Sequence, residues 1–352
     1  MRCIRVFPLL LLFLVACTGG FPSSPAVPAS QLVYLRMGRA GAELVSAAGS
    51  PGAVGTLNVP SDCVIYGLYP NPAKTVLAIE LECQGGPQID FYDIQAGQRA
   101  SLGTAAAHFL AWAADGRFVY LKTGGVDNPQ IVRIDEASRQ ASTLDLPADL
   151  YDLAVLPDGR LVYSTTRGLG FGSETWLADA SGRHARRILS EPGDIVAYLR
   201  PSPDGKQLAF IRFPDSQTPF PDGELWIMDT GGKNARSLGE ADAGHGYAPA
   251  WSPDGSQLAV VGRDNPTDPQ VEQSASALHS NVYRVQVRSG VRTPVSTFAK
   301  AVVETPVWSP DGLSLYFNVA ENDTIQVWYE QAGVLQPLNA GASCCAIWVP
   351  GK

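Results

Sequence analysis

The sequence is poor in the residues and motifs that build most enzyme active sites. It contains four histidines, and no two of them have the spacing of a metal-ligand pair. It has no G-x-S-x-G, H-E-x-x-H or C-x-x-C motif and no glycine-rich phosphate loop, which excludes the common signatures of hydrolases, zinc proteases, thiol oxidoreductases and nucleotide-binding enzymes. Acidic residues outnumber basic ones, 34 to 26, which argues against nucleic acid as a partner. We predict no catalytic residue, no metal and no cofactor, so an enzyme is the less favoured class.

Long hydrophobic runs are also missing, apart from one at the N-terminus. Arg2 and Arg5 precede an uncharged stretch over residues 6–16, which is shorter than the roughly 20 residues that a membrane-spanning helix needs. A basic start, a short apolar middle and a small residue at the end are typical of a secretory signal peptide.

The end of this stretch resembles the lipobox of bacterial lipoproteins. The letters LVAC run over residues 14–17, and in that family cleavage before the cysteine leaves its sulfur carrying a diacylglycerol. We predict a signal peptide over residues 1–16, lipidation of Cys17 with a flexible linker over residues 17–30, and a folded domain over residues 31–352. The protein is then anchored to a membrane of the cell envelope and faces the periplasm or the exterior. The alternative is an ordinary signal peptide in which the cysteine stands by chance.

A turn signal recurs along the folded domain. The letters WSPDG occupy residues 251–255 and again residues 308–312, and looser copies begin Asp-Gly pairs at Asp115, Asp158 and Asp204. Successive copies are separated by about 43 to 57 residues, which is in the range of propeller blades. Each copy joins two short alternating strands, and two further strands follow without any helical run. This pattern predicts an all-β propeller of four-stranded antiparallel blades.

The two ends of the domain predict how the ring closes. Residues 31–60 supply three strands, and residues 343–352 supply one more, which ends in the broken motif WVPGK. Joining them completes one blade, and six more blades begin near residues 62, 108, 151, 196, 247 and 303. We therefore predict seven blades, with six or eight as alternatives because the first two blades are weakly patterned.

The repeat unit resembles the WD-like repeat of TolB-type propellers. The family pattern xxPxWSPDGxxLaF is seen here in YAPAWSPDGSQLAV, and the strand that follows it in the family is seen in ELWIMDTGGKNARSL. The likeness is strongest over residues 196–338 and weak before residue 108. It implies a propeller fold and a binding role in the cell envelope. TolB itself has an α/β domain before a six-bladed propeller, whereas here only the linker precedes residue 31.

The acidic residue of the repeated turn is predicted to be structural. Proline sets φ near −65° at the first corner, the aspartate accepts backbone N–H groups and the glycine takes a positive φ. A repeated catalytic acid needs a partner at every copy, and none recurs with it. We therefore expect Asp254 and Asp311 to shape their turns, and Trp251 and Trp308 to wedge between neighbouring blades.

Four cysteines lie in the folded domain, and disulfides persist outside the cytosol. Cys63 and Cys83 lie on the two strands that flank the turn YPNPAK and fall opposite each other, so we predict a disulfide between them. Cys344 and Cys345 are adjacent in the closing strand. Three alternatives are open for this pair: a disulfide between the two cysteines, disulfides to other cysteines, or free thiols.

The mouth of the central channel is where we expect a binding site. Long loops follow the second strands of three consecutive blades, beginning at Arg167, Arg212 and Gly262, and they share a face with the starts of the inner strands. The alternative is that they are tolerated insertions. The register of the repeat places these residues on the channel wall: Ile65, His108, Tyr151, Ala197, Tyr247, Glu304 and Cys344.

We predict a monomeric module that binds a protein or peptide of the cell envelope. The ligand-binding candidates are His108, Tyr151, Phe213, Phe220, His245, Tyr247, Asp264, Asp268 and Glu304. One alternative is a hydrolase or lyase with its site at the channel mouth, around His108, Tyr151, His245 and Glu304. Another is glycan binding, with Phe213 and Phe220 stacking on sugar rings. Asp264, Asn265 and Asp268 hold Ca²⁺ or serve as plain turn residues, and we predict the latter.

Overall fold

The computed structural model describes residues 30–38, 41–47, 53–105, 107–125, 128–244, 248–322, 324–338 and 344–350. The predicted signal peptide, Cys17 and the linker as far as residue 29 lie outside the described residues, as do His245 and Tyr247. Within the described part, no helix is long and apolar enough to cross a membrane.

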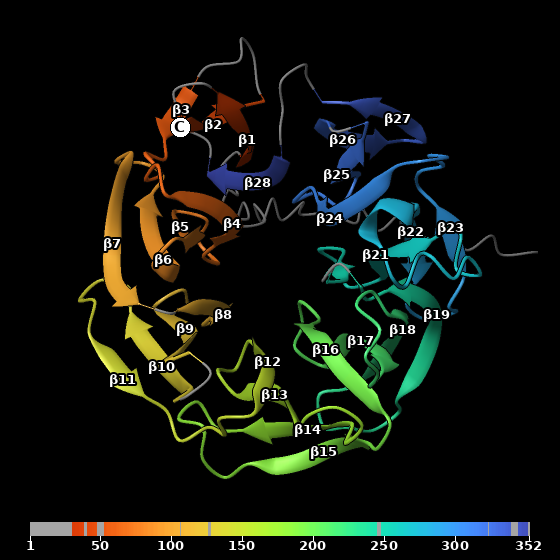
Figure 1. Cartoon of the computed structure of the whole chain (residues 1–352), viewed down its shortest axis with the longest axis horizontal. Helices are drawn as coiled ribbons and strands as arrows, with labels where there is room; N and C mark the ends of the chain where they lie inside the picture. The colour runs from red at the N-terminus through yellow and green to blue at the C-terminus, as the bar shows by residue number, and fades with distance from the viewer. Residues whose placement is uncertain are drawn as a thin grey trace, which may run out of the picture.

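Seven four-stranded antiparallel sheets form a ring about a central axis, which confirms the predicted seven-bladed β-propeller (Figure 1). Blade 1 comprises β28 (Cys344–Pro350), β1 (Ser30–Gly38), β2 (Gly41–Ser46) and β3 (Ala53–Thr56). Blade 2 comprises β4 (Cys63–Pro70), β5 (Val76–Cys83), β6 (Gly86–Asp93) and β7 (Gln98–Ala105). Blade 3 comprises β8 (His108–Trp112), β9 (Phe118–Thr123), β10 (Gln130–Asp135) and β11 (Ala141–Thr143). Blade 4 comprises β12 (Leu150–Val155), β13 (Leu161–Thr166), β14 (Ser173–Ala178) and β15 (Arg186–Glu191). Blade 5 comprises β16 (Asp194–Pro201), β17 (Gln207–Pro214), β18 (Asp222–Asp229) and β19 (Arg236–Asp242). Blade 6 comprises β20 (Ala250–Trp251), β21 (Gln257–Arg263), β22 (Ser280–Gln286) and β23 (Arg292–Pro294). Blade 7 comprises β24 (Val302–Trp308), β25 (Ser314–Glu321), β26 (Thr324–Gln331) and β27 (Val334–Pro337). A short 3-10 helix, η1 (Ala275–Ala277), lies between β21 and β22.

The apolar core lies between the blades. The second strand of a blade is buried over most of its length, as in Leu208 to Ile211 of β17, because the neighbouring blades cover both of its faces. Buried side chains from both blade 5 and blade 6, including Leu225 and Leu258, belong to one cluster that spans the two blades. Each blade is therefore stabilised chiefly by its two neighbours.

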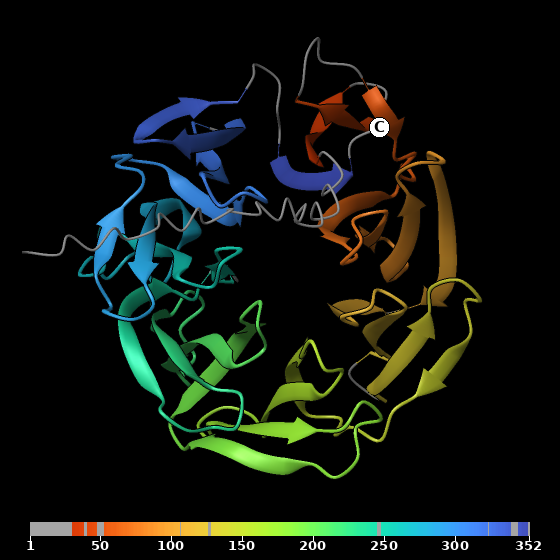
Figure 2. The ribbon, with the colours of Figure 1, turned by 180° about the vertical axis from the view of Figure 1, so that it is seen from behind.

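The ring is closed by pairing the two ends of the domain, as the broken motif WVPGK predicts. β28 runs antiparallel to β1, with Gln31 opposite Val349 and Val33 opposite Ile347. Figure 2 shows β28 on the inner edge of blade 1, seen from behind. The last strand of the chain is thus the innermost strand of the first blade.

The ring has two faces, which we define by its connections. The turns between first and second strands, such as residues 252–256, lie on one face, called the turn face. The connections between second and third strands begin at the other end of the second strands, on the loop face. Because Ser30 pairs with Pro350, at the end of β28, β1 starts at the turn face.

The aspartate of the repeated motif shapes the turn, as predicted. Asp254 Oδ1 accepts hydrogen bonds from the Ser252 hydroxyl at 2.6 Å and from the Ser256 N–H at 3.0 Å. The Ser252 hydroxyl oxygen accepts a bond from the Gln257 N–H at 3.0 Å, and Gly255 has a φ of 70°. The motif is therefore a local network in which every polar group serves the turn.

The tryptophans of the two WSPDG copies fasten blades 6 and 7 to the blades that precede them. Trp308 Nε1 donates to the Ala250 carbonyl of blade 6 at 3.0 Å, and Trp251 Nε1 donates to the Arg200 carbonyl of blade 5 at 2.8 Å. The predicted wedge role is confirmed, with a hydrogen bond added to the apolar contact.

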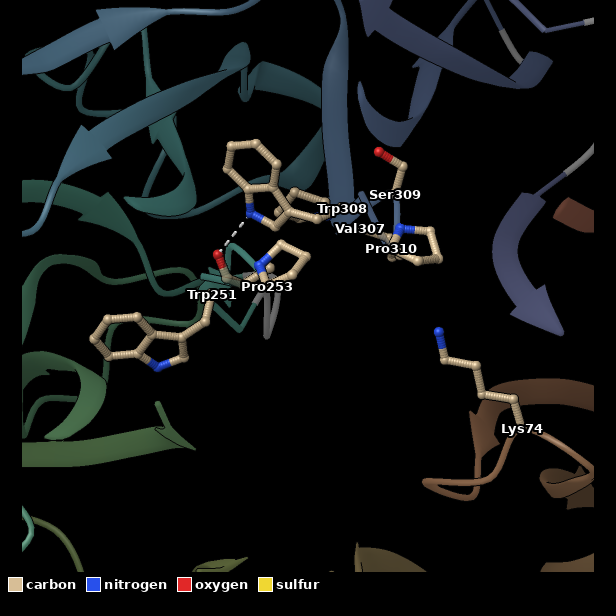
Figure 3. A pocket seen from close by; sticks show the side chains of 9 residues that line it. Lys74, Trp251, Pro253, Val307, Trp308, Ser309 and Pro310 are labelled. Atoms are coloured by element: carbon tan, nitrogen blue, oxygen red, sulfur yellow. Dashed lines mark hydrogen bonds between the residues drawn. The ribbon is translucent and has the colours of Figure 1, made fainter. Parts of the chain in front are cut away.

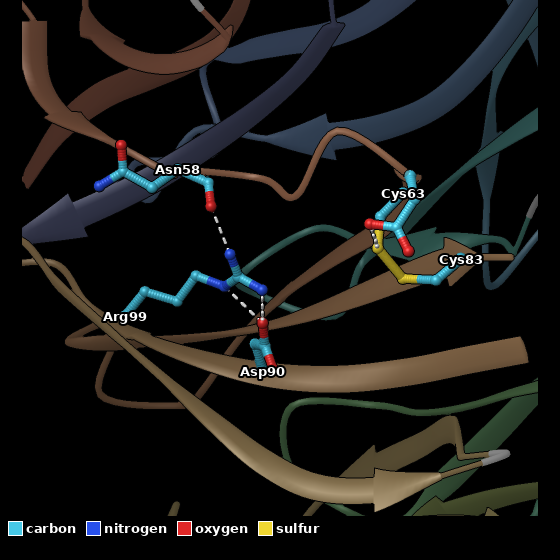
Figure 4. The surroundings of a disulfide bond; sticks show 6 residues. Asn58, Cys63, Cys83, Asp90 and Arg99 are labelled. Carbon is cyan, nitrogen blue, oxygen red and sulfur yellow. Dashed lines mark hydrogen bonds and ion pairs between the residues drawn. A yellow bond between two sulfur atoms is a disulfide. The ribbon is translucent and has the colours of Figure 1, made fainter. Parts of the chain in front are cut away.

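The predicted disulfide between Cys63 and Cys83 is confirmed, and it joins β4 to β5 with the two Cα atoms 4.0 Å apart. Figure 4 shows it near a second fastening of the same blade, in which Arg99 contacts the buried Asp90 and the Asn58 carbonyl. Of the alternatives open for Cys344 and Cys345, the structure has the bond between them.

Acid should weaken the repeated turns. Hydrogen bonds from serine hydroxyls, and to a smaller extent from backbone N–H groups, hold the pKa values of Asp204, Asp254 and Asp311 below their usual range. Since the folded-state pKa is depressed, these carboxylates contribute stability above the unfolded pKa of about 3.9 and lose it as the pH falls through the folded value. A variant with all three aspartates changed to Asn is expected to be less stable than wild type at pH 7, by up to about 1 kcal/mol per exposed turn.

Urea unfolding of both proteins from pH 7 down to pH 2 measures this difference. It should shrink below about pH 4. A single Asp145→Asn change serves as the control, because Asp145 belongs to none of these turns. A difference between wild type and the triple variant that stays constant to pH 2 contradicts the structural role assigned to the turn carboxylates.

Candidate functional site

A cleft of about 380 Å³ opens at the loop-face mouth of the channel, between blade 4, blade 5 and the segment that follows β19. Tyr151 and Tyr198, from the inner strands β12 and β16, form its channel side. Leu169 and Asp215 stand on loops of blades 4 and 5, and Gly244 follows β19. The cleft therefore lies where the three long loops predict a wall beside the channel. Its lining is Tyr151, Thr166, Gly168, Leu169, Ile195, Tyr198, Phe213, Pro214, Asp215, Ser216, Thr218, Pro219, Pro221, Ala243 and Gly244.

The three long loops are joined into one wall. The Gly172 N–H of the blade 4 loop donates to Asp215 Oδ2 of the blade 5 loop at 2.7 Å. The Phe220 N–H of the blade 5 loop donates to the Glu272 carbonyl of the blade 6 loop at 3.2 Å. Gly172 has a φ of 67°, and a Cβ there would lie 2.0 Å from the Glu191 carbonyl oxygen, so only glycine fits. These cross-loop bonds hold the wall in one arrangement.

A buried arginine fixes the wall from behind. Arg263 Nη2 donates to the carbonyls of Phe220 and Pro221 at 2.8 and 2.9 Å. The same nitrogen lies 2.7 Å from Asp242 Oδ1, and the side chains of Arg263 and Asp242 are 1% and 0% exposed. Asp242 Oδ1 also accepts the Gly244 N–H at 3.1 Å. One ion pair thus orders the end of the blade 5 loop and the segment after β19.

Inner strands of three blades carry a tyrosine, and two of these, Tyr151 and Tyr198, line the cleft. Tyr66 of β4 is 74% exposed and Tyr151 is 47% exposed, so solvent reaches the inner strands. Burial raises the pKa of Tyr198, and the nearby Tyr151 and Asp152 raise it further. The sequence register placed Ile65 on the channel wall, and this was wrong by one residue. Lys74 takes the positive φ that glycine takes in the other turns, so Tyr66 occupies the equivalent position.

Three inner strands are kinked at the same place in the repeat. Tyr198, Thr305 and Cys345 all have positive φ, at 58°, 46° and 64°. At two of the kinks, a side chain of a neighbouring blade accepts a hydrogen bond from a backbone N–H group. Asp152 Oδ2 accepts from Leu199 at 2.7 Å, and Asn318 Oδ1 accepts from Cys345 at 3.0 Å. These bonds compensate the strain and hold the channel wall in place.

His108 lies on β8, and its side chain is 55% exposed. Its Nδ1 is 2.9 Å from Oε1 of the buried Glu80, whose Oε2 accepts the Tyr69 hydroxyl at 3.1 Å. A carboxylate on one ring nitrogen orients the imidazole and leaves the other nitrogen available. Glu80 is a candidate that sequence reasoning missed, because the contact joins residues 28 positions apart.

The remaining predicted residues do not form one site. Glu304 lies on β24 of blade 7 and is not among the residues that line the cleft. Phe213 is 8% exposed and packs in the core shared by blades 5 and 6, so it is not a free stacking surface for a sugar. Phe220 is half-buried, and its backbone is held by Arg263 and Glu272.

The polar side chains of the blade 6 loop are hydrogen-bonded to the loop itself or to the strand β22 that follows it. Asp264 Oδ1 accepts the Tyr283 hydroxyl at 3.1 Å, and Asp268 Oδ1 accepts the Gln270 N–H at 2.9 Å. The Asn265 amide donates to the Ala277 carbonyl at 2.9 Å. Among the described residues, no group of three or more His, Cys, Asp and Glu side chains is placed to hold a metal ion.

No family model matches the sequence, and no curated protein matches it. Solved structures do match its fold. TolB from Acinetobacter baumannii is 17% identical, with 92% of this chain and 83% of that chain covered and a TM-score of 0.51. The fold is that of a TolB-like β-propeller.

Enzymes share this TolB-like fold. An oligogalacturonate lyase in complex with manganese is 13% identical, covering 86% of this chain and 84% of that chain, with a TM-score of 0.58. A prolyl endopeptidase is 10% identical, covering 94% of this chain and 50% of that chain, with a TM-score of 0.63. At these identities the likeness extends to the fold alone.

Removing the buried arginine should loosen the wall and the whole domain. Arg263→Met leaves the Asp242 carboxylate buried without its cation, which is expected to lower the free energy of unfolding by about 3–5 kcal/mol. The control is Arg167→Met, because the Arg167 side chain is 75% exposed and its ion pair with Glu174 is 4.0 Å long. That change should cost less than about 1 kcal/mol. Equal losses for the two variants in urea unfolding would refute the role assigned to Arg263.

Proposed function

We propose that this TolB-like propeller is a lipid-anchored protein of the bacterial cell envelope that binds a protein or peptide partner in the loop-face cleft. The observation that carries the proposal is the cleft itself, a preformed hollow with tyrosine, proline and leucine walls on cross-bonded loops. Tyrosines on a rigid surface supply large contact areas at low entropic cost, and they are enriched in protein interfaces.

The rim of the cleft supports a macromolecular partner. Leu169 is 50% exposed, and Phe171, on the same loop, is 71% exposed. Tyr151 adds a third exposed side chain, at the channel mouth. Exposed apolar side chains that cluster beside a preformed cleft are typical of interaction surfaces rather than of plain solvent-facing loops.

The two faces of the ring are suited to different contacts, the turn face to a membrane anchor and the loop face to a partner. β1 starts at the turn face, and Cys17 lies 13 positions before Ser30. A lipid on Cys17 therefore tethers the turn face to the membrane. The cleft opens on the opposite face, away from the bilayer, where an envelope partner reaches it without competing with lipid.

A second candidate function is an enzyme that works in the channel. The observation that favours it is the contact of His108 with the buried carboxylate of Glu80 at 2.9 Å. A carboxylate-oriented imidazole with one exposed nitrogen is the arrangement of a general base, and it lies at the channel wall with Tyr151. The hydrolase or lyase alternative would be built around this pair, and it ranks second because the cleft and its apolar rim lie on blades 4 and 5, away from His108 and Glu80.

Chemical cross-linking of the lipidated protein in its own membranes tests partner binding. A double variant, Tyr151→Ala with Leu169→Ala, removes two exposed apolar side chains from the cleft. It should lower the recovery of the cross-linked partner by about 10-fold or more, because central apolar contacts carry most of an interface energy.

The matched control is Val291→Ala with Leu313→Ala, two residues that are 57% and 64% exposed and lie outside the cleft. This control should recover the partner as wild type does. Recovery that is unchanged by the cleft variant, or lost equally in both variants, rejects the loop-face cleft as the binding site.

A further inference from the structure

The loop-face cleft contains a single charged side chain. Of the described residues that line it, only Asp215 carries a formal charge, and the others are apolar residues, glycines, tyrosines and small hydroxyl residues. One half-buried carboxylate therefore sets the charge of the cleft.

This carboxylate is held in place by the two loops that meet at the cleft. The Asp215 N–H donates to the Gly193 carbonyl at 3.0 Å, and Asp215 Oδ2 accepts the Gly172 N–H at 2.7 Å. Within the described part of the chain, Oδ1 accepts no hydrogen bond, and it is not among the buried polar atoms that lack a partner. A ligand in the cleft can therefore reach a carboxylate oxygen whose position is already fixed.

The basic residues around the cleft are paired with other acids. Arg212 Nε donates to Asp194 Oδ2 at 2.7 Å, and Arg263 is held in the buried ion pair described above. Arg167, which precedes the lining residue Gly168, lies 4.0 Å from Glu174. No ion pair to Asp215 is formed by any residue that the structure describes, so its charge is left for a ligand to neutralise.

The other walls of the cleft suit one particular kind of cation. Tyr151 and Tyr198 stand on the channel side, and the Tyr198 hydroxyl is held by the Ala243 carbonyl at 3.4 Å. A guanidinium group stacks on tyrosine rings and donates two parallel N–H groups to a carboxylate, whereas an ammonium group does only the second as a point charge. The combination of a fixed carboxylate and two tyrosines therefore favours arginine.

The size of the cleft favours a side chain of a larger partner. Its volume of about 380 Å³ is at the small end of the range for ligand pockets, roughly 300 to 1,000 Å³, so it admits a side chain and not a folded surface. Leu169 and Phe171 on the rim are placed to contact apolar residues beside that side chain. The formal net charge of the chain, −8, also attracts a basic segment from a distance.

The opposite mouth of the channel carries the opposite charge. A hollow of about 470 Å³ at the turn face has Trp251, Trp308 and Pro310 on one side, and Lys74 faces them from the other (Figure 3). Lys74 is the one charged side chain among the described residues that line this hollow. A basic side chain is therefore repelled at the turn face and attracted at the loop face.

We propose that the loop-face cleft recognises an arginine side chain, flanked by apolar residues, that the partner inserts into it. The guanidinium pairs with Asp215 and lies against the tyrosine rings, while the apolar neighbours contact Leu169 and Phe171. This inference rests on the partner binding proposed above and names the chemistry that the partner brings.

Two matched dipeptides test this recognition without the natural partner. Acetyl-leucyl-arginine amide carries the cation, and acetyl-leucyl-citrulline amide has nearly the same shape without the charge. Their binding to the full chain in detergent micelles is measured by saturation-transfer NMR at millimolar concentrations. We expect the arginine peptide to bind wild type about 5-fold more tightly than the citrulline peptide.

Two variants assign this preference to one carboxylate. Asp215→Asn should abolish the preference for arginine, and because the amide oxygen still accepts the Gly172 N–H, the wall is kept. The control is Asp268→Asn, since Asp268 is a half-buried loop carboxylate that also accepts one backbone N–H but does not line the cleft. This control should keep the preference of wild type.

The outcomes separate this inference from the proposed function. Equal affinities of the two dipeptides for wild type, no binding of either, or a preference that survives Asp215→Asn would overturn the arginine site, even where the cleft captures a partner in membranes. A preference that only Asp215→Asn abolishes supports the site, and it would do so even if cross-linking rejected a protein partner.

Discussion

The pairing of β28 with β1 is the interaction on which the rest of the structure depends. Within the other blades, neighbouring strands follow each other in sequence, but this pairing joins Gln31 to Val349 across the whole length of the domain. A blade buries its apolar faces only against its neighbours, so an open ring leaves two blades with an uncovered side. Closure also puts the start of β1 at the turn face, which sets the side from which the linker and any lipid anchor approach the ring.

Closure alone does not make a rigid channel, and buried polar side chains complete it. Asp152 accepts the Leu199 N–H of the next blade, and Asn318 accepts the Cys345 N–H across the closing seam. Each bond compensates a kink in an inner strand. The loop-face wall stands on this frame and is fixed in turn by Arg263, a residue buried behind the site rather than in it. The shape of the cleft therefore depends on polar contacts between residues that are distant in sequence. The blades that carry these residues are formed by local turn motifs.

This division explains what could be predicted from the sequence. Blades 4 to 7 were predictable because each has a proline, an aspartate and a glycine in one turn, and blade 3 keeps the last two. The closing strand was predictable from the broken motif WVPGK. The Cys63–Cys83 disulfide followed from the same hairpin register. The register of blade 2 was misjudged because Lys74 takes the positive φ without being glycine. The contacts of Arg263 with Asp242 and of His108 with Glu80 join residues 21 and 28 positions apart, and no local pattern reports such partners.

Thermal unfolding of a chain that lacks residues 343–352 tests the central claim most directly. The deletion removes β28, with the buried side chains of Ala346, Ile347 and Val349. A chain lacking only residues 351–352 is the control. The account predicts that the first deletion lowers Tm by more than about 10 °C relative to the control, because several kcal/mol of apolar burial and the closing seam are lost together. A Tm within about 2 °C of the control would show that the ring does not depend on its last strand.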